Sequence, residues 1–118
     1  MIDHFNLPVA DLERSKAFYD KVLAAIGYHT FGKDGNAVGY GETTWAFGIV
    51  TTLGIIPCLH VAFTATSQRQ VDEFHRVALE LGARSNGTPG SRVQYDPNYY
   101  AAFVRDPDGH NVEAVFRG

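Results

Sequence analysis

Two histidines and one glutamate are the residues whose types and positions best fit metal chemistry. His4 opens an apolar stretch near the start of the chain, His60 opens a similar stretch in the second half, and Glu113 lies among apolar residues near the end. Two imidazoles and one carboxylate suit Fe(II), Mn(II), Ni(II) or Zn(II) and leave coordination positions open for a substrate. We therefore predict a divalent metal site at His4, His60 and Glu113.

Strand alternation supports this grouping. Successive side chains of a strand point to opposite faces, so if Leu7 and Val9 pack under a helix, His4 faces away from it. The same pattern places His60 and Glu113 on equivalent faces of their strands. Taken singly, a histidine in a strand is more often a hydrogen-bonded structural residue, and a glutamate there is commonly solvated. The shared repeat position of the two histidines is what favours metal binding.

An internal repeat predicts the fold. Residues 4–27 can be laid over residues 60–82, with histidine on histidine and Phe18 on Phe74. Each copy reads as a strand, an amphipathic helix with a capping residue (Asp11 or Ser67), and three further strands separated by turns. We predict one α+β domain over residues 1–118, built from two β-α-β-β-β modules at about 1–53 and 58–118. Their curved mixed sheets should surround a cavity, with one helix per module outside.

Composition excludes several classes of partner. Ten Lys and Arg against thirteen Asp and Glu give a net charge of -3, without the basic stripe that nucleic-acid phosphates require. No stretch approaches the roughly 20 apolar residues of a membrane span, and the first residues lack the pattern of a secretion signal. Cys58 is the only cysteine, which rules out an internal disulfide. We expect a cytoplasmic protein that binds neither nucleic acid nor membrane.

Three segments carry a family resemblance: DHFNLPVADLERSKAFYDKVLAAIGY at the start, LHVAFTA at the restart, and FVRDPDGHNVEAVF at the end. They resemble the vicinal oxygen chelate superfamily, which includes glyoxalase I, extradiol dioxygenases, fosfomycin-resistance enzymes and bleomycin-binding proteins. The resemblance covers the whole chain. It implies paired modules, a divalent metal in the cavity between them and often a homodimer, with the ligand positions on His4, His60 and Glu113. In a lyase or isomerase, Glu113 or a metal-bound water would move the proton.

The sequence departs from two members of the superfamily. Glyoxalase I has a fourth ligand on the last strand of its first module, where matching the two modules places Phe47 opposite Glu113. Extradiol dioxygenases usually have a tyrosine ten residues before the carboxylate ligand, and this chain has Phe103 there. Tyr99 and Tyr100 are nearby, and the register of the hairpin decides whether either replaces it.

Aromatic and basic residues are candidates for the substrate pocket. We expect Trp45 and Phe47 to form a hydrophobic wall on the cavity side of their strand, with Tyr100 and Phe103 beside them. Arg92 is a candidate for contact with an anionic or oxygen-rich substrate. Core packing of the aromatic residues and solvation of the arginine are the alternatives.

These features predict a metal-dependent enzyme whose small substrate chelates the metal through vicinal oxygens. A lyase or isomerase is favoured over a ring-cleaving dioxygenase because the dioxygenase tyrosine is replaced. The alternative is a non-catalytic protein that sequesters a small molecule, of the bleomycin-resistance type. The sequence leaves open whether the modules pair within one chain or between two chains.

Overall fold

A computed structural model describes residues 1–118 as two β-α-β-β-β modules, which confirms the predicted fold class. The elements of the first module are β1 (Phe5–Val9), α1 (Leu12–Ala24), β2 (His29–Asp34), β3 (Ala37–Gly41) and β4 (Phe47–Thr51). Those of the second are β5 (His60–Thr64), α2 (Gln68–Glu80), β6 (Arg84–Ser91), β7 (Tyr100–Arg105) and β8 (Asn111–Phe116). Neither helix is long and apolar enough to cross a membrane.

Both helices begin at the residues that the sequence indicated. The Asp11 side chain accepts a hydrogen bond from the backbone N–H of Arg14 at 3.1 Å, and Ser67 Oγ accepts one from Gln70 N–H at 3.1 Å. Each bond satisfies one of the backbone donors left free in a first helical turn. The capping residues therefore fix where each module changes from strand to helix.

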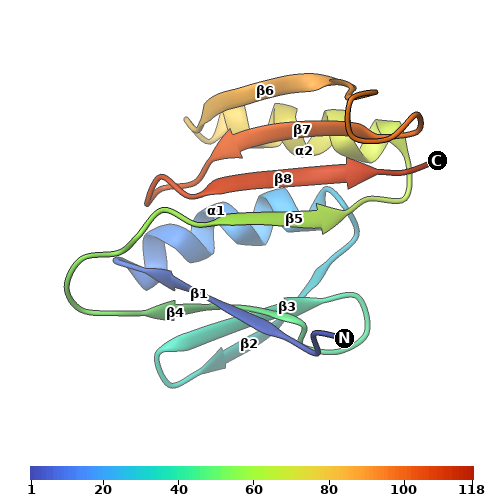
Figure 1. Cartoon of the computed structure of the whole chain (residues 1–118). Helices are drawn as coiled ribbons and strands as arrows, with labels where there is room; N and C mark the ends of the chain where they lie inside the picture. The colour runs from blue at the N-terminus through green and yellow to red at the C-terminus, as the bar shows by residue number, and fades with distance from the viewer.

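The strands form two mixed sheets of four, in the orders β1-β4-β3-β2 and β5-β8-β7-β6. The strand before each helix pairs in parallel with the last strand of its module, and the remaining pairs are antiparallel. Figure 1 shows β1 and β5 facing each other in the middle of the molecule, with both helices on the same side of the sheets. We call the face opposite the helices the open face.

The two modules share one hydrophobic core on the helix side. It contains 20 buried residues, drawn from both helices and both sheets. Phe47 of β4 and Phe63 of β5 meet edge to face across the boundary, with ring centroids 4.8 Å apart. The helices also contact each other. Burial of these apolar side chains holds the modules together within the chain.

The edge strands β1 and β5 run in opposite directions (Figure 1). One side chain marks their alignment, because the His110 imidazole hydrogen-bonds both Pro8 O, near the end of β1, and Leu59 N, just before β5. The end of β1 therefore lies beside the start of β5. This arrangement decides which candidate ligands can meet.

Candidate functional site

His60 and Glu113 come together on the open face of the second module. In the parallel pair β5–β8, Glu113 is the register partner of Ala62, so its side chain lies on the same face as His60. His60 Nε2 is 3.0 Å from Glu113 Oε1. Glu113 is only 2% exposed, whereas the His60 side chain is about half exposed at 49%. One buried carboxylate and one accessible imidazole thus form the centre of the site.

The other imidazole nitrogen determines what this pair can bind. His60 Nδ1 is 3.1 Å from the carbonyl oxygen of Asn111, and a carbonyl only accepts, so Nδ1 carries the hydrogen. In the neutral ring Nε2 then has a lone pair, which faces the electron-rich Glu113 oxygen. Two acceptor atoms at this distance repel each other unless a proton or a metal cation lies between them. The same arrangement of a backbone carbonyl behind the imidazole orients histidines that bind metals.

Tyr99 is a third member of the site. Its hydroxyl donates a hydrogen bond to Glu113 Oε2, on the carboxylate oxygen that does not face His60. Burial, and then the hydrogen bond and charge of Glu113, raise the pKa of Tyr99 to about 12, so the phenol remains a donor at neutral pH. The Arg117 guanidinium lies 4.8 Å from the centre of the Tyr99 ring. The β7–β8 hairpin therefore places Tyr99 against the carboxylate of Glu113, although the residue ten positions before Glu113 is Phe103.

Phe103 lies in the same hollow as His60 and Glu113. It lies directly opposite Glu113 in the β7–β8 pair, and its ring stacks on the His60 imidazole with centroids 6.2 Å apart. The hollow has a volume of about 390 Å³. It is lined by His60, Tyr95, Tyr99, Phe103, Asn111, Glu113 and Arg117.

The expectation for Tyr100 needs correction. Its side chain points to the opposite face from that of Tyr99, and its hydroxyl donates to Asp72 Oδ1 of α2 at 2.6 Å. Arg92 also lies outside the hollow. Its guanidinium donates to the carbonyls of Gly90 and Thr88 and lies 5.4 Å from the centre of the Phe103 ring. Arg92 thus packs against the Phe103 ring and does not line the hollow.

The placement of Phe47 on the cavity side is wrong. Phe47 is 3% exposed and packs on Tyr19 of α1, with ring centroids 5.4 Å apart, so it belongs to the helix-side core. The register also corrects the match between modules. Asn6 pairs with Gly48 in β1–β4 as Ala62 pairs with Glu113 in β5–β8. Gly48, with no side chain, is the counterpart of Glu113.

His4 lies in a different hollow from the other two candidate ligands. This second hollow, of about 400 Å³, is lined by His4, Asn6, Asp34, Ala37 and Trp45. His4 is four residues before Pro8, which lies level with the start of β5, and four residues of strand span roughly 13 Å. A metal ion has ligands at about 2.0–2.3 Å. Within one chain, His60 and Glu113 meet, but His4 does not reach them.

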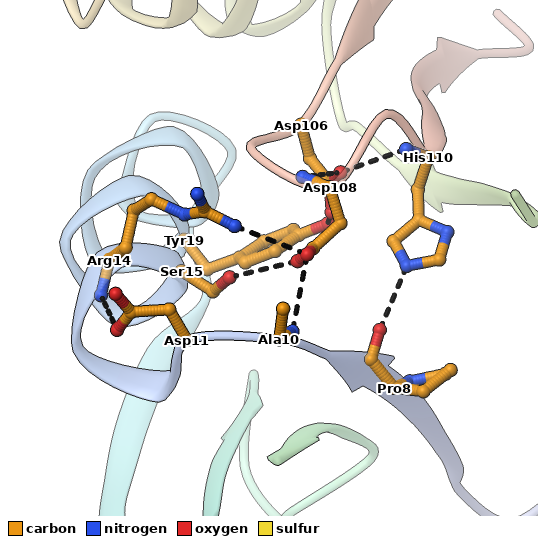
Figure 2. Close-up of polar contacts among 9 residues, drawn as sticks. All are labelled: Pro8, Ala10, Asp11, Arg14, Ser15, Tyr19, Asp106, Asp108 and His110. Carbon is orange, nitrogen blue, oxygen red and sulfur yellow. Dashed lines mark hydrogen bonds and ion pairs between the residues drawn. The ribbon is translucent and has the colours of Figure 1, made fainter. Parts of the chain in front are cut away.

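A separate group of Asp106, Asp108 and His110 has atoms spaced for a metal ion, with one candidate ligand atom from each within 4.8 Å of the others (Figure 2). Both His110 nitrogens are already used, because Nδ1 accepts from Leu59 N at 2.9 Å and Nε2 donates to Pro8 O at 2.8 Å. This imidazole therefore has no lone pair free for a metal.

The two carboxylates of this group are also engaged by protein donors. Asp106 accepts from the Tyr19 hydroxyl at 2.6 Å and from the backbone N–H groups of Asp108 and His110. Asp108 accepts from the residues at the start of the first helix: Ala10 N, Arg14 Nη2 and Ser15 Oγ. These contacts tie the β7–β8 turn to the first module (Figure 2). We assign the group a structural role and name it the module latch.

A third hollow, of about 1080 Å³ and so larger than the other two, lies between this turn, α1 and the segment that joins α2 to β6. None of His4, His60 and Glu113 lines it. Size alone therefore does not identify the chemical site, whereas the His60–Glu113–Tyr99 group brings together an imidazole, a buried carboxylate and a phenol. The first two of these groups are predictable from the sequence, whereas Tyr99 depends on the register of the hairpin.

Paired β-α-β-β-β modules that carry a histidine and a carboxylate on their open face define the class of protein. The chain belongs to the Glyoxalase/Bleomycin resistance protein/Dioxygenase superfamily, whose family model matches residues 1–114. This confirms the resemblance seen in the sequence. The superfamily includes enzymes, and its members typically bind a divalent metal.

Individual proteins are similar over nearly the whole chain. A glyoxalase/bleomycin resistance protein from Albidiferax ferrireducens has 31% sequence identity and a TM-score of 0.87, with 98% of each chain covered. The Bacillus subtilis protein YqjT, described as uncharacterized, is 28% identical over 95% of both chains. The lactoylglutathione lyase of Agrobacterium tumefaciens has the same fold, with a TM-score of 0.73 at 21% identity and coverage of 98% of this chain and 92% of that one.

Proposed function

We propose that this protein is a metal-dependent homodimeric enzyme whose small substrate chelates a divalent metal through two neighbouring oxygens. His60 and Glu113 hold the metal together with the partner subunit's His4. The free thiol of Cys58 fits a reducing, cytoplasmic setting. This proposal extends the family membership to a specific ligand set and assembly.

The observation that carries the proposal is the meeting of His60 Nε2 and Glu113 Oε1 at 3.0 Å, with Nδ1 already bound to a backbone carbonyl. A deprotonated Nε2 and a carboxylate oxygen are both good donors to Fe(II), Mn(II), Ni(II) or Zn(II). The pair lies in a hollow that is open to small molecules. A metal cation between these two atoms would remove the repulsion of their lone pairs, as a proton on Nε2 would.

Each side chain has a distinct part in the chemistry. The bound metal would polarise a substrate oxygen and stabilise the negative charge that develops there. Tyr99 donates to Glu113 Oε2 and so orients the carboxylate. We assign Glu113 the movement of a proton at the carbon next to the polarised oxygen, because it is the carboxylate that lines the hollow. Phe103 packs on His60 and excludes water from one side.

The separation of His4 from His60 supports an assembly of two chains. His4 lines its own hollow on the open face of the first module, and a second copy related by twofold symmetry can bring that hollow against the second module. Each dimer would then contain two identical cavities. Because the module latch and shared core hold the halves of one chain side by side, the ligands are completed across the dimer.

Metal binding tests the proposal directly. Chain purified without chelator should contain close to one divalent ion, and added Ni(II) or Zn(II) should raise the melting temperature of stripped protein. Glu113→Gln and His60→Gln should each weaken binding by at least about 100-fold, since each removes a ligand. His29→Gln is the control, because His29 is exposed on β2. Unchanged affinity in the His60 and Glu113 variants would refute the site.

Activity assays then separate the reactions. A hemithioacetal isomerisation assay tests for a lyase, and oxygen uptake with a catechol after anaerobic Fe(II) loading tests for a ring-cleaving dioxygenase. The Tyr99–Glu113 contact removes the main argument against a dioxygenase, because a tyrosine does reach the carboxylate. A chain that binds no metal and catalyses neither reaction would instead be a sequestering protein.

A further inference from the structure

Two glycines lie side by side on the open face of the first module. Gly39 of β3 and Gly48 of β4 are register partners, and their neighbours Val38, Tyr40 and Ile49 are buried in the helix-side core. Glycine weakens the interior of a strand, and it often marks a place where another group must approach the backbone closely. We therefore expect another group to lie against the backbone of this glycine pair on the open face.

The indole ring of Trp45 occupies the space that Gly39 leaves. A Cβ built on Gly39 would lie 1.9 Å from Cδ2 of Trp45, 2.2 Å from Cε3 and 2.3 Å from Cε2. Cδ2 is bonded to Cε3 and Cε2, so such similar distances mean that the glycine meets the face of the ring and not its edge. The Cβ position of Gly48 lies 2.3 Å from Oδ1 of Asn6 and 3.1 Å from Nε1 of the ring, so Asn6 fills most of the space at this glycine. The ring thus lies flat on the backbone of Gly39.

Trp45 also borders the hollow that contains His4. Trp45 is half-buried and lines this hollow together with His4 and Asn6. One ring face is therefore packed on the strands, while the residue remains accessible beside a proposed metal ligand. A ligand held at the metal by two oxygens would have this aromatic surface next to it. A smaller side chain could cover the glycine backbone, so the size of the indole ring suggests a second role for Trp45.

We infer that Trp45 is a stacking platform, and that the cavity selects ligands with a planar aromatic ring next to their vicinal oxygens. The inference rests on the proposed function for the position of the oxygens, but the platform itself exists within one chain. Face-to-face contact with an aromatic ligand adds attraction that a saturated ligand of equal size does not receive. The platform thus specifies a substrate class for the site.

The first experiment needs no metal. Trp45 is the only tryptophan, so labelled protein gives a single indole N–H signal in an NMR spectrum. Titration with phenol should shift this signal saturably, whereas cyclohexanol, of similar size and with the same hydroxyl group, should not. In Gly39→Ala the added methyl expels the ring, and the phenol response should disappear. Equal responses to phenol and cyclohexanol in the unmodified protein would overturn the inference, whether or not the variant folds.

The second experiment connects the platform to the metal. With Ni(II) or Zn(II) bound, Trp45→Leu should weaken the binding of catechol by about 3- to 10-fold and leave oxalate binding unchanged. Phe31→Leu is the matched control, since Phe31 is an exposed aromatic residue on β2 outside the hollow. An equal loss for catechol and oxalate would contradict the platform. Failure of the metal to bind would refute the proposed function, while the phenol titration would still decide the inference.

Discussion

Mixing two inactive variants tests whether the metal site is shared between subunits. We consider His4→Gln and Glu113→Gln, which remove ligands from different modules. His4 lies roughly 13 Å along the strand from the level of His60, so one chain cannot supply all three ligands to one ion. In either variant alone, every cavity of a homodimer lacks a ligand. Both proteins should therefore lose tight binding of Ni(II) or Zn(II).

A mixed dimer regains one complete cavity. It combines the intact His4 of the Glu113→Gln chain with the intact His60 and Glu113 of the His4→Gln chain, while its second cavity lacks both ligands. Random pairing of equal amounts makes about half of the dimers mixed, so about a quarter of all cavities should be restored. Unfolding and refolding the two variants together, followed by calorimetric titration with the metal, measures this fraction.

The control is a mixture of His60→Gln with Glu113→Gln. Both changes lie in the second module, so no pairing of these chains produces a complete ligand set. This mixture should stay at the level of the separate variants. If the first mixture shows no recovery although mixed dimers form, the three ligands do not converge between subunits, and the proposed composite site is refuted.

Further predictions concern stability. His110→Ala should lower the free energy of unfolding by about 2–4 kcal/mol in a denaturant titration, because it leaves the Pro8 and Leu59 backbone groups unpaired, and a loss below about 0.5 kcal/mol would contradict the latch. Tyr19→Phe should cost about 1–2 kcal/mol by the same measurement, since a buried Asp106 oxygen loses its donor; no change would show that water replaces it. Burial lowers the pKa of His75 below its usual 6.5, so the unfolded chain binds the proton more readily. The stability from neutral His75 is complete above about pH 6.5 and is lost as the pH falls; His75→Gln should flatten this part of the melting-temperature profile, and an unchanged profile would disprove the assignment.

The internal repeat made the fold predictable. Each copy contains a capping residue, a helix with one apolar stripe and a glycine at its end, and local signals of this kind are largely independent of distant contacts. The pairing of His60 with Glu113 also followed from strand alternation, since each lies between apolar neighbours. For these two residues, the neighbouring sequence alone was sufficient to predict the face of the strand on which they lie.

The wrong predictions concern strands in which apolar and polar residues do not alternate. The segment around β4 has small or apolar residues on both faces, so the sequence could not tell whether Phe47 or Gly48 faced the helices. The register of β4 with β1 shows that Phe47 faces the helices and Gly48 lies on the open face. Tyr99 and Tyr100 are adjacent residues of the same type, and only the pairing of β7 with β8 determines which one reaches Glu113. The position of His4 depends on how the modules are arranged, which no local pattern encodes.

Gly48 at the position that corresponds to Glu113 has a consequence for how the two halves of the chain have diverged. The two copies of the unit offer different groups on the open face: the first has His4, Asp34 and the Trp45 ring, and the second has His60, Glu113 and Tyr99. Under the proposed function, Glu113 is the only carboxylate that each chain places at the metal. Saturation should therefore stop at one equivalent per chain, even though the architecture is twofold repetitive.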